Sequence, residues 1–150
     1  MHDLYFDDFS VGQRFVSARR TVTADEIAAF AQAYDPNPFH LDDAPARAAG
    51  YPGIIASGFH MLSLSFRLFF DLKLWETAIM PSPGMDAVRW LKPLLPGQTI
   101  WIEAEVTEVI PSTSKPDRGI LRFRHDTFAE PGEKLMTVDC MHRLRRRASV

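Results

Sequence analysis

The stretch "SGFHMLSLSFRLFF", residues 57–70, decides the fold because it predicts a helix that is apolar on nearly every side. Its apolar side chains cover almost the whole helical circumference, and Arg67 is the main exception. A helix of this kind is normally buried. It is too short and too polar to span a bilayer, since His60 and two serines interrupt it. We therefore expect a central helix enclosed by other elements of a water-soluble protein.

The half of the chain after this helix predicts strands. In "TIWIEAEVTEV" (99–109), apolar residues alternate with polar ones, and "ILRFRHDTF" (120–128) and "KLMTVDCMHRLRRR" (134–147) show the same period of two. "GMDAVRWLK" (84–92) and the early stretch "GQRFVSARRTV" (12–22) are further strand candidates. Period-two segments with one apolar face are typical of an antiparallel sheet covered on one side.

These elements predict an α+β architecture. The predicted order is a strand, a short helix, a loop, the buried helix and about four strands. The architecture that best accommodates this order is a curved antiparallel sheet wrapped around one long helix, which is the hotdog fold. The length of 150 residues predicts a single domain over 1–150. Apolar residues on the outer face of the sheet and strands left at its edges favour a homodimer or a higher homo-oligomer.

The amino-acid composition limits the kinds of binding partner that we expect. The net charge of −2 gives no electrostatic reason to expect nucleic acid or an anionic membrane. Cys140 is the single cysteine, so it cannot form an intramolecular disulfide, and we expect no metal motif to be built on it. A reducing compartment and an acidic N-terminus without an apolar signal core favour a cytoplasmic protein.

A second stretch, "DPNPFH" (35–40), holds the first candidate catalytic residues. It follows a helix predicted to begin at a capping box of Thr23 and Glu26 and to end near Tyr34, before the prolines. The prolines stiffen a loop that carries Asp35 and His40, which together can act as an acid and base on one water molecule. The residue types alone favour a simple helix stop with an incidental acid and imidazole. Asp35 and His40 lack a third ligand nearby, so we expect no metal there.

The start of the central helix is the second candidate site. Ser57 and Gly58 lie where free backbone N–H groups carry partial positive charge, and these can receive a carbonyl oxygen as it gains negative charge. A glycine lets a ligand approach closely. An N-cap serine followed by a packing glycine explains the same residues without chemistry. Together with the acid/base pair, however, an oxyanion site suits proton transfer next to a thioester carbonyl.

The residues of these two candidate sites resemble those of a known family. Residues 35–40 match the D-x-N-P-x-H motif of the MaoC-like dehydratases, which include the (R)-specific enoyl-CoA hydratases. The glycine-led helix "GIIASGFHMLSLSFRLF" (53–69) and "VRWLKPLLPGQTIWIEAEV" (88–106) are similar to later parts of that family, and the likeness extends from about Phe9 to Arg145.

The resemblance implies a lyase that adds or removes water across the α,β bond of an acyl-CoA thioester, with coenzyme A as part of the substrate and no cofactor. Asp35 and His40 would bind and activate the water. The resemblance leaves open which of them is the acid and which the base; of the two orders we favour His40 taking the water proton and Asp35 supplying a proton to the α carbon. The Gly58 N–H would polarise the carbonyl. Asn37 would help to hold the loop, and Ser57 would lie beside Gly58.

Bulky residues near these positions are candidates to line or close the acyl pocket; they are Phe59, Met61, Phe66 and Trp90. Phe59 is also expected to contact the substrate.

Two other functions fit a hotdog fold. A hotdog acyl-CoA thioesterase usually relies on a carboxylate in or near the central helix, and residues 57–70 contain no Asp or Glu. A non-catalytic subunit that only binds acyl thioesters would not need the intact pair of Asp35 and His40.

Overall fold

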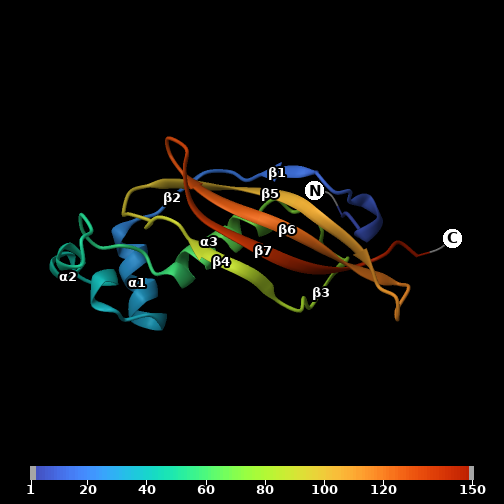
Figure 1. Cartoon of the computed structure of the whole chain (residues 1–150), viewed down its shortest axis with the longest axis horizontal. Coiled ribbons are helices and arrows are strands. Elements are labelled where there is room, and N and C mark those ends of the chain that lie inside the picture. Colours follow the sequence, from blue (N-terminus) through green and yellow to red (C-terminus); the bar gives the residue numbers. More distant parts are fainter. Residues whose placement is uncertain (1–2, 149–150) are drawn as a thin grey trace.

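A curved antiparallel sheet encloses most of one side of a single long helix in the computed structural model, which describes residues 3–148 (Figure 1). The helices are α1 (Ala24–Tyr34), α2 (Asp43–Ala48) and α3 (Gly58–Phe70), with 3-10 turns η1 (Phe6–Asp8) and η2 (Pro38–His40). The strands are β1 (Arg14–Val16), β2 (Arg20–Thr21), β3 (Ile79–Met80), β4 (Met85–Trp90), β5 (Thr99–Pro111), β6 (Arg118–Ala129) and β7 (Glu133–Arg145). This is the predicted hotdog architecture.

Three long neighbouring strands, β5, β6 and β7, form the middle of the sheet. β1 and β2 both pair with the outer side of β5, and β3 and β4 both pair with the outer side of β7. The predicted strand over 12–22 is therefore two strands. It is interrupted at Ser17, where the side-chain oxygen accepts the Ile102 N–H in place of a backbone carbonyl. β3 lies outside the segments that the sequence predicts as strands.

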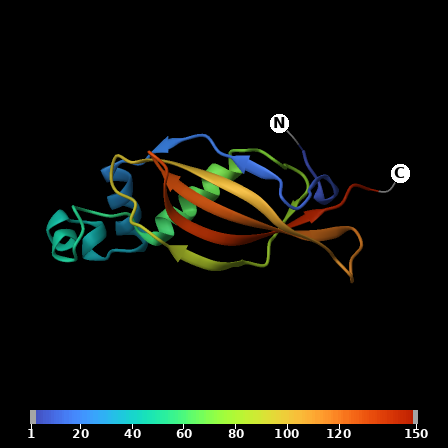
Figure 2. The same cartoon turned by 45° about the horizontal axis from the view of Figure 1, so that its top comes forward.

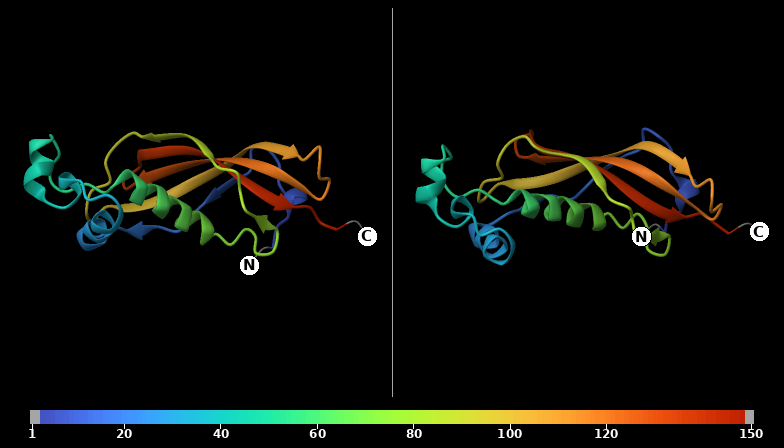
Figure 3. Two further views of the ribbon diagram at one scale, coloured as in Figure 1. Left: turned by 90° about the horizontal axis from the view of Figure 1, so that it is seen from below. Right: turned by 60° about the horizontal axis from the view of Figure 1, so that its bottom comes forward.

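Helix α3 lies across the concave face of the sheet (Figures 2 and 3). Its buried side chains, including Met61, Leu64 and Leu68, join the inner-face residues of the central strands in one hydrophobic core. Alternation along β5 puts Ile100 and Ile102 into this core, as period two predicts.

The prediction that α3 is buried on all sides is wrong for the single chain. Phe59, Phe66 and Phe70 are 60%, 47% and 58% exposed. The physical reason is that one curved sheet covers only one side of a helix, and α1 covers little of the rest.

The two shorter helices gather at one end of the sheet, beside the N-terminus of α3 (Figure 3). α1 begins as predicted. The Thr23 hydroxyl accepts the Glu26 N–H at 3.2 Å, and the Glu26 carboxylate accepts the Thr23 N–H at 2.9 Å. Among residues 3–148 no helix has the length and apolar character needed to cross a membrane. The grouping of α1, α2 and the start of α3 positions the candidate site.

Candidate active site

The loop after α1 and the segment leading into α3 are joined by their backbones. The Ile55 N–H donates to the Phe39 carbonyl at 3.1 Å, and the Ala56 N–H donates to the Leu94 carbonyl at 2.9 Å. The first bond ties η2 to the entry of α3, and the second ties that entry to the chain just before β5. As a result, residues 35–40 and residues 57–58, which are distant in sequence, face each other.

His40 is buried, and its ring is oriented by one strong contact. Its Nδ1 atom lies 2.7 Å from the Ile55 carbonyl oxygen. Because a carbonyl oxygen only accepts hydrogen bonds, Nδ1 must carry the proton. The other ring nitrogen, Nε2, therefore faces the site, where it lies 3.2 Å from Asp35 Oδ2.

Asp35 receives hydrogen bonds from two further side chains. The Ser57 hydroxyl donates to Oδ2 at 2.7 Å, and the Asn37 amide donates to Oδ1 at 2.5 Å. The Ser57 bond is the main cause that lowers the pKa of Asp35, and burial opposes it. Asn37 lowers the pKa further, as does His40 when its ring is protonated at both nitrogens. Asp35 is thus held in its ionised form at neutral pH, at a fixed distance from the imidazole.

The first residues of α3 supply the positive end of the site. The Ser57 hydroxyl accepts the Phe59 N–H at 3.2 Å, so it caps the helix as well as binding Asp35. The Gly58 N–H has no acceptor in the part of the chain that the structure describes. A free N–H at a helix N-terminus is suited to a partially negative oxygen.

Gly58 also has the packing role that was the alternative explanation of the sequence, and its neighbour is Trp90. The Trp90 indole N–H donates to the Gly58 carbonyl at 3.0 Å, and the ring lies against the Gly58 Cα. A Cβ atom on residue 58 would lie 2.5 Å from Trp90 Cε2, which is closer than van der Waals contact permits.

A cavity of about 360 Å³ joins these groups. Asp35, His40 and Gly58 lie on its wall together with three of the four bulky residues considered above; these are Phe59, Met61 and Trp90. Its volume falls within the range of roughly 300–1,000 Å³ that is typical of small-molecule sites. Phe66, the fourth bulky candidate, does not line it.

Of the six predicted site residues, four contact one another through Asp35; they are Asp35, Asn37, His40 and Ser57. Gly58 follows Ser57 directly in the chain. Phe59 lines the same cavity. The sequence analysis missed Tyr51 and Lys92, which also line it. Neither belongs to a motif or a periodic pattern, so only the three-dimensional arrangement identifies them.

His60, one turn into α3, lies outside this group. Its ring stacks on Phe30 with centroids 4.6 Å apart, and burial lowers its pKa. Its Nδ1 atom is buried without a hydrogen-bond partner among residues 3–148. His60 is thus a buried histidine that does not line the cavity at Asp35 and His40.

This chain has recognisable relatives among known proteins. Residues 8–126 match the family model of the MaoC like domain. The chain is 30% identical to the uncharacterised protein YdeM of Bacillus subtilis (strain 168) over 129 residues, which are 86% of this chain and 90% of YdeM.

Two solved structures share the fold. The MaoC-like dehydratase from Rhodospirillum rubrum is 35% identical, with a TM-score of 0.86 over 97% of this chain and 99% of that one. The (R)-hydratase from A. caviae, involved in PHA biosynthesis, is 26% identical, with a TM-score of 0.71 over 89% of this chain and 96% of that one.

Proposed function

Because this chain belongs to the family of MaoC-like dehydratases, we propose that it adds water to, or removes water from, the α,β bond of an acyl-CoA thioester. The observation that carries the proposal is the 3.2 Å approach of His40 Nε2 to Asp35 Oδ2 on the wall of a cavity that Gly58 also lines. Coenzyme A enters as part of the substrate.

In the hydration direction, the reacting water binds to His40 Nε2 and Asp35 Oδ2. The fixed tautomer of His40 leaves the Nε2 lone pair free, so this nitrogen takes a proton as the water oxygen attacks the β carbon. The imidazolium that forms is stabilised by the ionised Asp35 beside it.

The electrons of the double bond move toward the thioester as the new carbon–oxygen bond forms. The negative charge that develops on the carbonyl oxygen is stabilised by the Gly58 N–H at the positive end of α3. Removing a single donor of this type from an acyl-transfer enzyme costs about 100- to 1,000-fold in rate. A backbone donor cannot be removed by mutating its own side chain, so the cavity wall around Gly58 has to be altered instead.

A proton must then reach the α carbon. Asp35 begins ionised because its pKa is lowered, so it can only return a proton that it has first received. We propose that the proton taken by His40 passes to Asp35 Oδ2 and from there to the α carbon. The proton lost by water is then the one gained by carbon, and both residues return to their starting states.

The test is hydration of a short enoyl-CoA, followed by loss of its conjugated absorbance. Asp35→Asn and His40→Gln should each lower kcat/KM by about 100- to 10,000-fold, the usual contribution of a general acid or base. Asp42→Asn is the matched control, since Asp42 lies in the same loop region but its side chain makes no capping hydrogen bond. Full activity in both site variants would refute the proposal.

The same reaction mixture separates the alternatives. Release of free thiol without hydration would indicate a thioesterase, although α3 offers no carboxylate for that chemistry. Binding of enoyl- and hydroxyacyl-CoAs without turnover would indicate a non-catalytic subunit. Neither alternative explains why two donors hold Asp35 ionised beside an oriented imidazole.

We further propose that a second copy of the chain covers the exposed side of α3. Large apolar side chains are exposed along this helix and on the β3–β4 side of the sheet; they are Phe59, Phe66, Phe70, Ile79, Met85 and Trp90. Among residues 3–148, strand β4 pairs with β7 alone, so its other edge is open to a partner. Since Phe59 and Trp90 also line the active-site cavity, the partner would complete the wall of that cavity.

Light scattering on the purified protein tests this assembly. We expect a dimer or a larger even-numbered oligomer for the wild type. Phe66→Glu and Phe70→Glu, which do not line the active-site cavity, should give monomers. A wild-type monomer at micromolar concentration would contradict the proposed assembly.

A further inference from the structure

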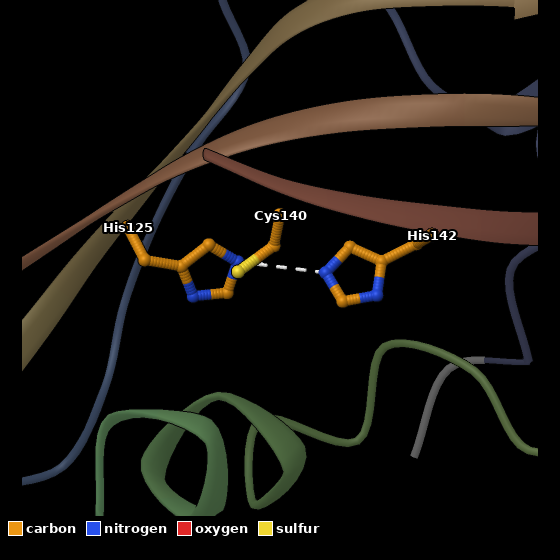
Figure 4. A group of neighbouring side chains, drawn as sticks. All are labelled: His125, Cys140 and His142. Carbon is orange, nitrogen blue, oxygen red and sulfur yellow. Dashed lines mark hydrogen bonds between the residues drawn. The ribbon is translucent and has the colours of Figure 1, made fainter. Parts of the chain in front are cut away.

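A second group of chemically reactive side chains lies inside the sheet, apart from the active site. His125 on β6 and Cys140 and His142 on β7 are all buried on the face toward α3. Figure 4 shows the two imidazole rings pointing toward each other with the Cys140 sulfur between them. One ligand atom from each residue lies within 4.8 Å of the other two, and the two Nε2 atoms are 3.5 Å apart.

The strand register explains how residues so far apart in sequence converge. Cys140 lies opposite Phe123, and His125 lies two residues further along β6 on the same face. His142 is two residues beyond Cys140, again on the same face. The imidazoles therefore approach the thiol from its two sides.

Packing alone does not account for this cluster. Within residues 3–148, the only hydrogen-bond partner of either imidazole is the other imidazole. Aromatic rings surround them, with Phe69 at 4.5 Å from the His125 ring and 5.0 Å from the His142 ring. At 3.5 Å the contact between the two imidazoles is longer than an ordinary hydrogen bond, so an ion placed between the two Nε2 atoms would bind both lone pairs better than the rings satisfy each other.

We propose that His125, Cys140 and His142 bind one thiophilic transition-metal ion, Zn²⁺ or Cu⁺. Imidazole nitrogen and cysteine sulfur are the ligands that these ions prefer. With metal–nitrogen bonds near 2.0–2.1 Å, two nitrogens of a tetrahedral site lie about 3.3 Å apart, close to the 3.5 Å observed. A nitrogen and a sulfur of such a site lie about 3.6 Å apart, so the Cys140 sulfur needs to move by no more than about 1.2 Å.

Metal binding releases one proton from the protein. The Cys140 thiol releases its proton and the thiolate forms the metal–sulfur bond, while each neutral imidazole donates a lone pair. The resulting complex has a charge of +1 with Zn²⁺ and zero with Cu⁺. A neutral complex is the less costly of the two in an apolar, aromatic interior.

A further coordination position is available. A cavity of about 320 Å³ lies against His125 and Cys140 and is also lined by Ser65 and Met85. Met85 lies opposite Cys140 in the β4–β7 register. Either a water molecule in this cavity or the Met85 thioether can complete the site. The cavity shares no lining residue with the one at Asp35, so the proposal is independent of the hydratase function.

The test uses the intact protein after removal of metal with a chelator. It is titrated with Co²⁺ as a spectroscopic substitute for Zn²⁺, and separately with Cu⁺ without oxygen against a chromogenic Cu⁺ chelator. We expect one equivalent per chain for at least one ion, and for Co²⁺ a thiolate charge-transfer absorption. Cys140→Ser and His142→Gln should each weaken binding at least about 100-fold. His60→Gln, which changes a buried histidine outside the cluster, should bind as the wild type does.

X-ray absorption of the wild-type complex keeps the test valid if a variant fails to fold. One sulfur and two nitrogen neighbours at about 2.3 Å and 2.0–2.1 Å are expected for zinc. Three outcomes would overturn the proposal: no binding of either ion at tens of micromolar, unchanged affinity in folded Cys140→Ser and His142→Gln, or an ion surrounded only by nitrogen and oxygen.

Discussion

The two histidines buried in the sheet should make the metal-free protein sensitive to mild acid. Burial lowers the pKa of His142 to about 4, and burial together with the nearby His142 lowers that of His125 to about 3. In the unfolded chain both titrate near 6.5. Below that pH the unfolded state binds protons that the folded state does not. The stability due to neutral histidines is therefore fully present above about pH 6.5 and is lost as the pH falls.

The size of the effect follows from the two pKa values. At pH 5.0 each histidine favours the unfolded state by about 2 kcal/mol, because its unfolded form is almost fully protonated and its folded form is not. Together, His125 and His142 lower the free energy of unfolding by about 4 kcal/mol between pH 7.5 and 5.0. A loss of this size is a large part of the 5–15 kcal/mol that typically holds a domain folded.

Urea denaturation with a chelator present, at a fixed protein concentration and at several pH values from 7.5 to 5.0, measures this loss. The double variant His125→Gln/His142→Gln is the comparison, and its free energy of unfolding should vary far less with pH. A small slope should remain, since burial also lowers the pKa of His60. The reasoning is refuted if the wild type loses less than about 1 kcal/mol over this range, or if the double variant loses as much as the wild type.

Three further outcomes are expected. Asn37→Ala removes a donor that lowers the pKa of Asp35, so the acid limb of the pH–activity profile should move to higher pH; an unmoved limb would contradict the role of ionised Asp35. Gly58→Ala should displace Trp90 and reduce kcat/KM at least about tenfold. The free energy of unfolding measured in urea should change by less than about 1 kcal/mol, because alanine favours the helix. Gly119→Ala should lower the free energy of unfolding by about 1–3 kcal/mol, since its Cβ would lie 2.8 Å from a backbone carbonyl of β5, and an unchanged urea midpoint would refute that packing.

Much of the fold was predictable because hydrophobic periodicity reports directly which face of each element is buried. The alternation in residues 99–109 located β5 and its inner face, and the capping box at Thr23 located the start of α1. The exposure of Phe66 and Phe70 was not predictable. An apolar side chain has the same pattern whether its own sheet or a second copy of the chain covers it, so periodicity does not say which.

Of the two candidate sites, one was predictable from the sequence and the other was not. Asp35, Asn37 and His40 are adjacent in sequence and were found together, because prolines between them mark a rigid loop. The cluster of His125, Cys140 and His142 was missed, although its members lie on the predicted inner faces of two strands. Which residues of neighbouring strands meet depends on register, and register follows from the turns and core of the folded sheet.

The Ser57 hydroxyl shows why the loop at residues 35–40 differs from an ordinary helix stop. It accepts the Phe59 N–H and donates to Asp35, so one oxygen begins α3 and also fixes the acid of the proposed acid/base pair. The backbone bond from Ile55 to Phe39 and the contact of His40 with the Ile55 carbonyl hold the imidazole against the same helix start. Any shift of the α3 N-terminus would therefore move Asp35, His40 and the Gly58 N–H together, which would preserve their mutual geometry.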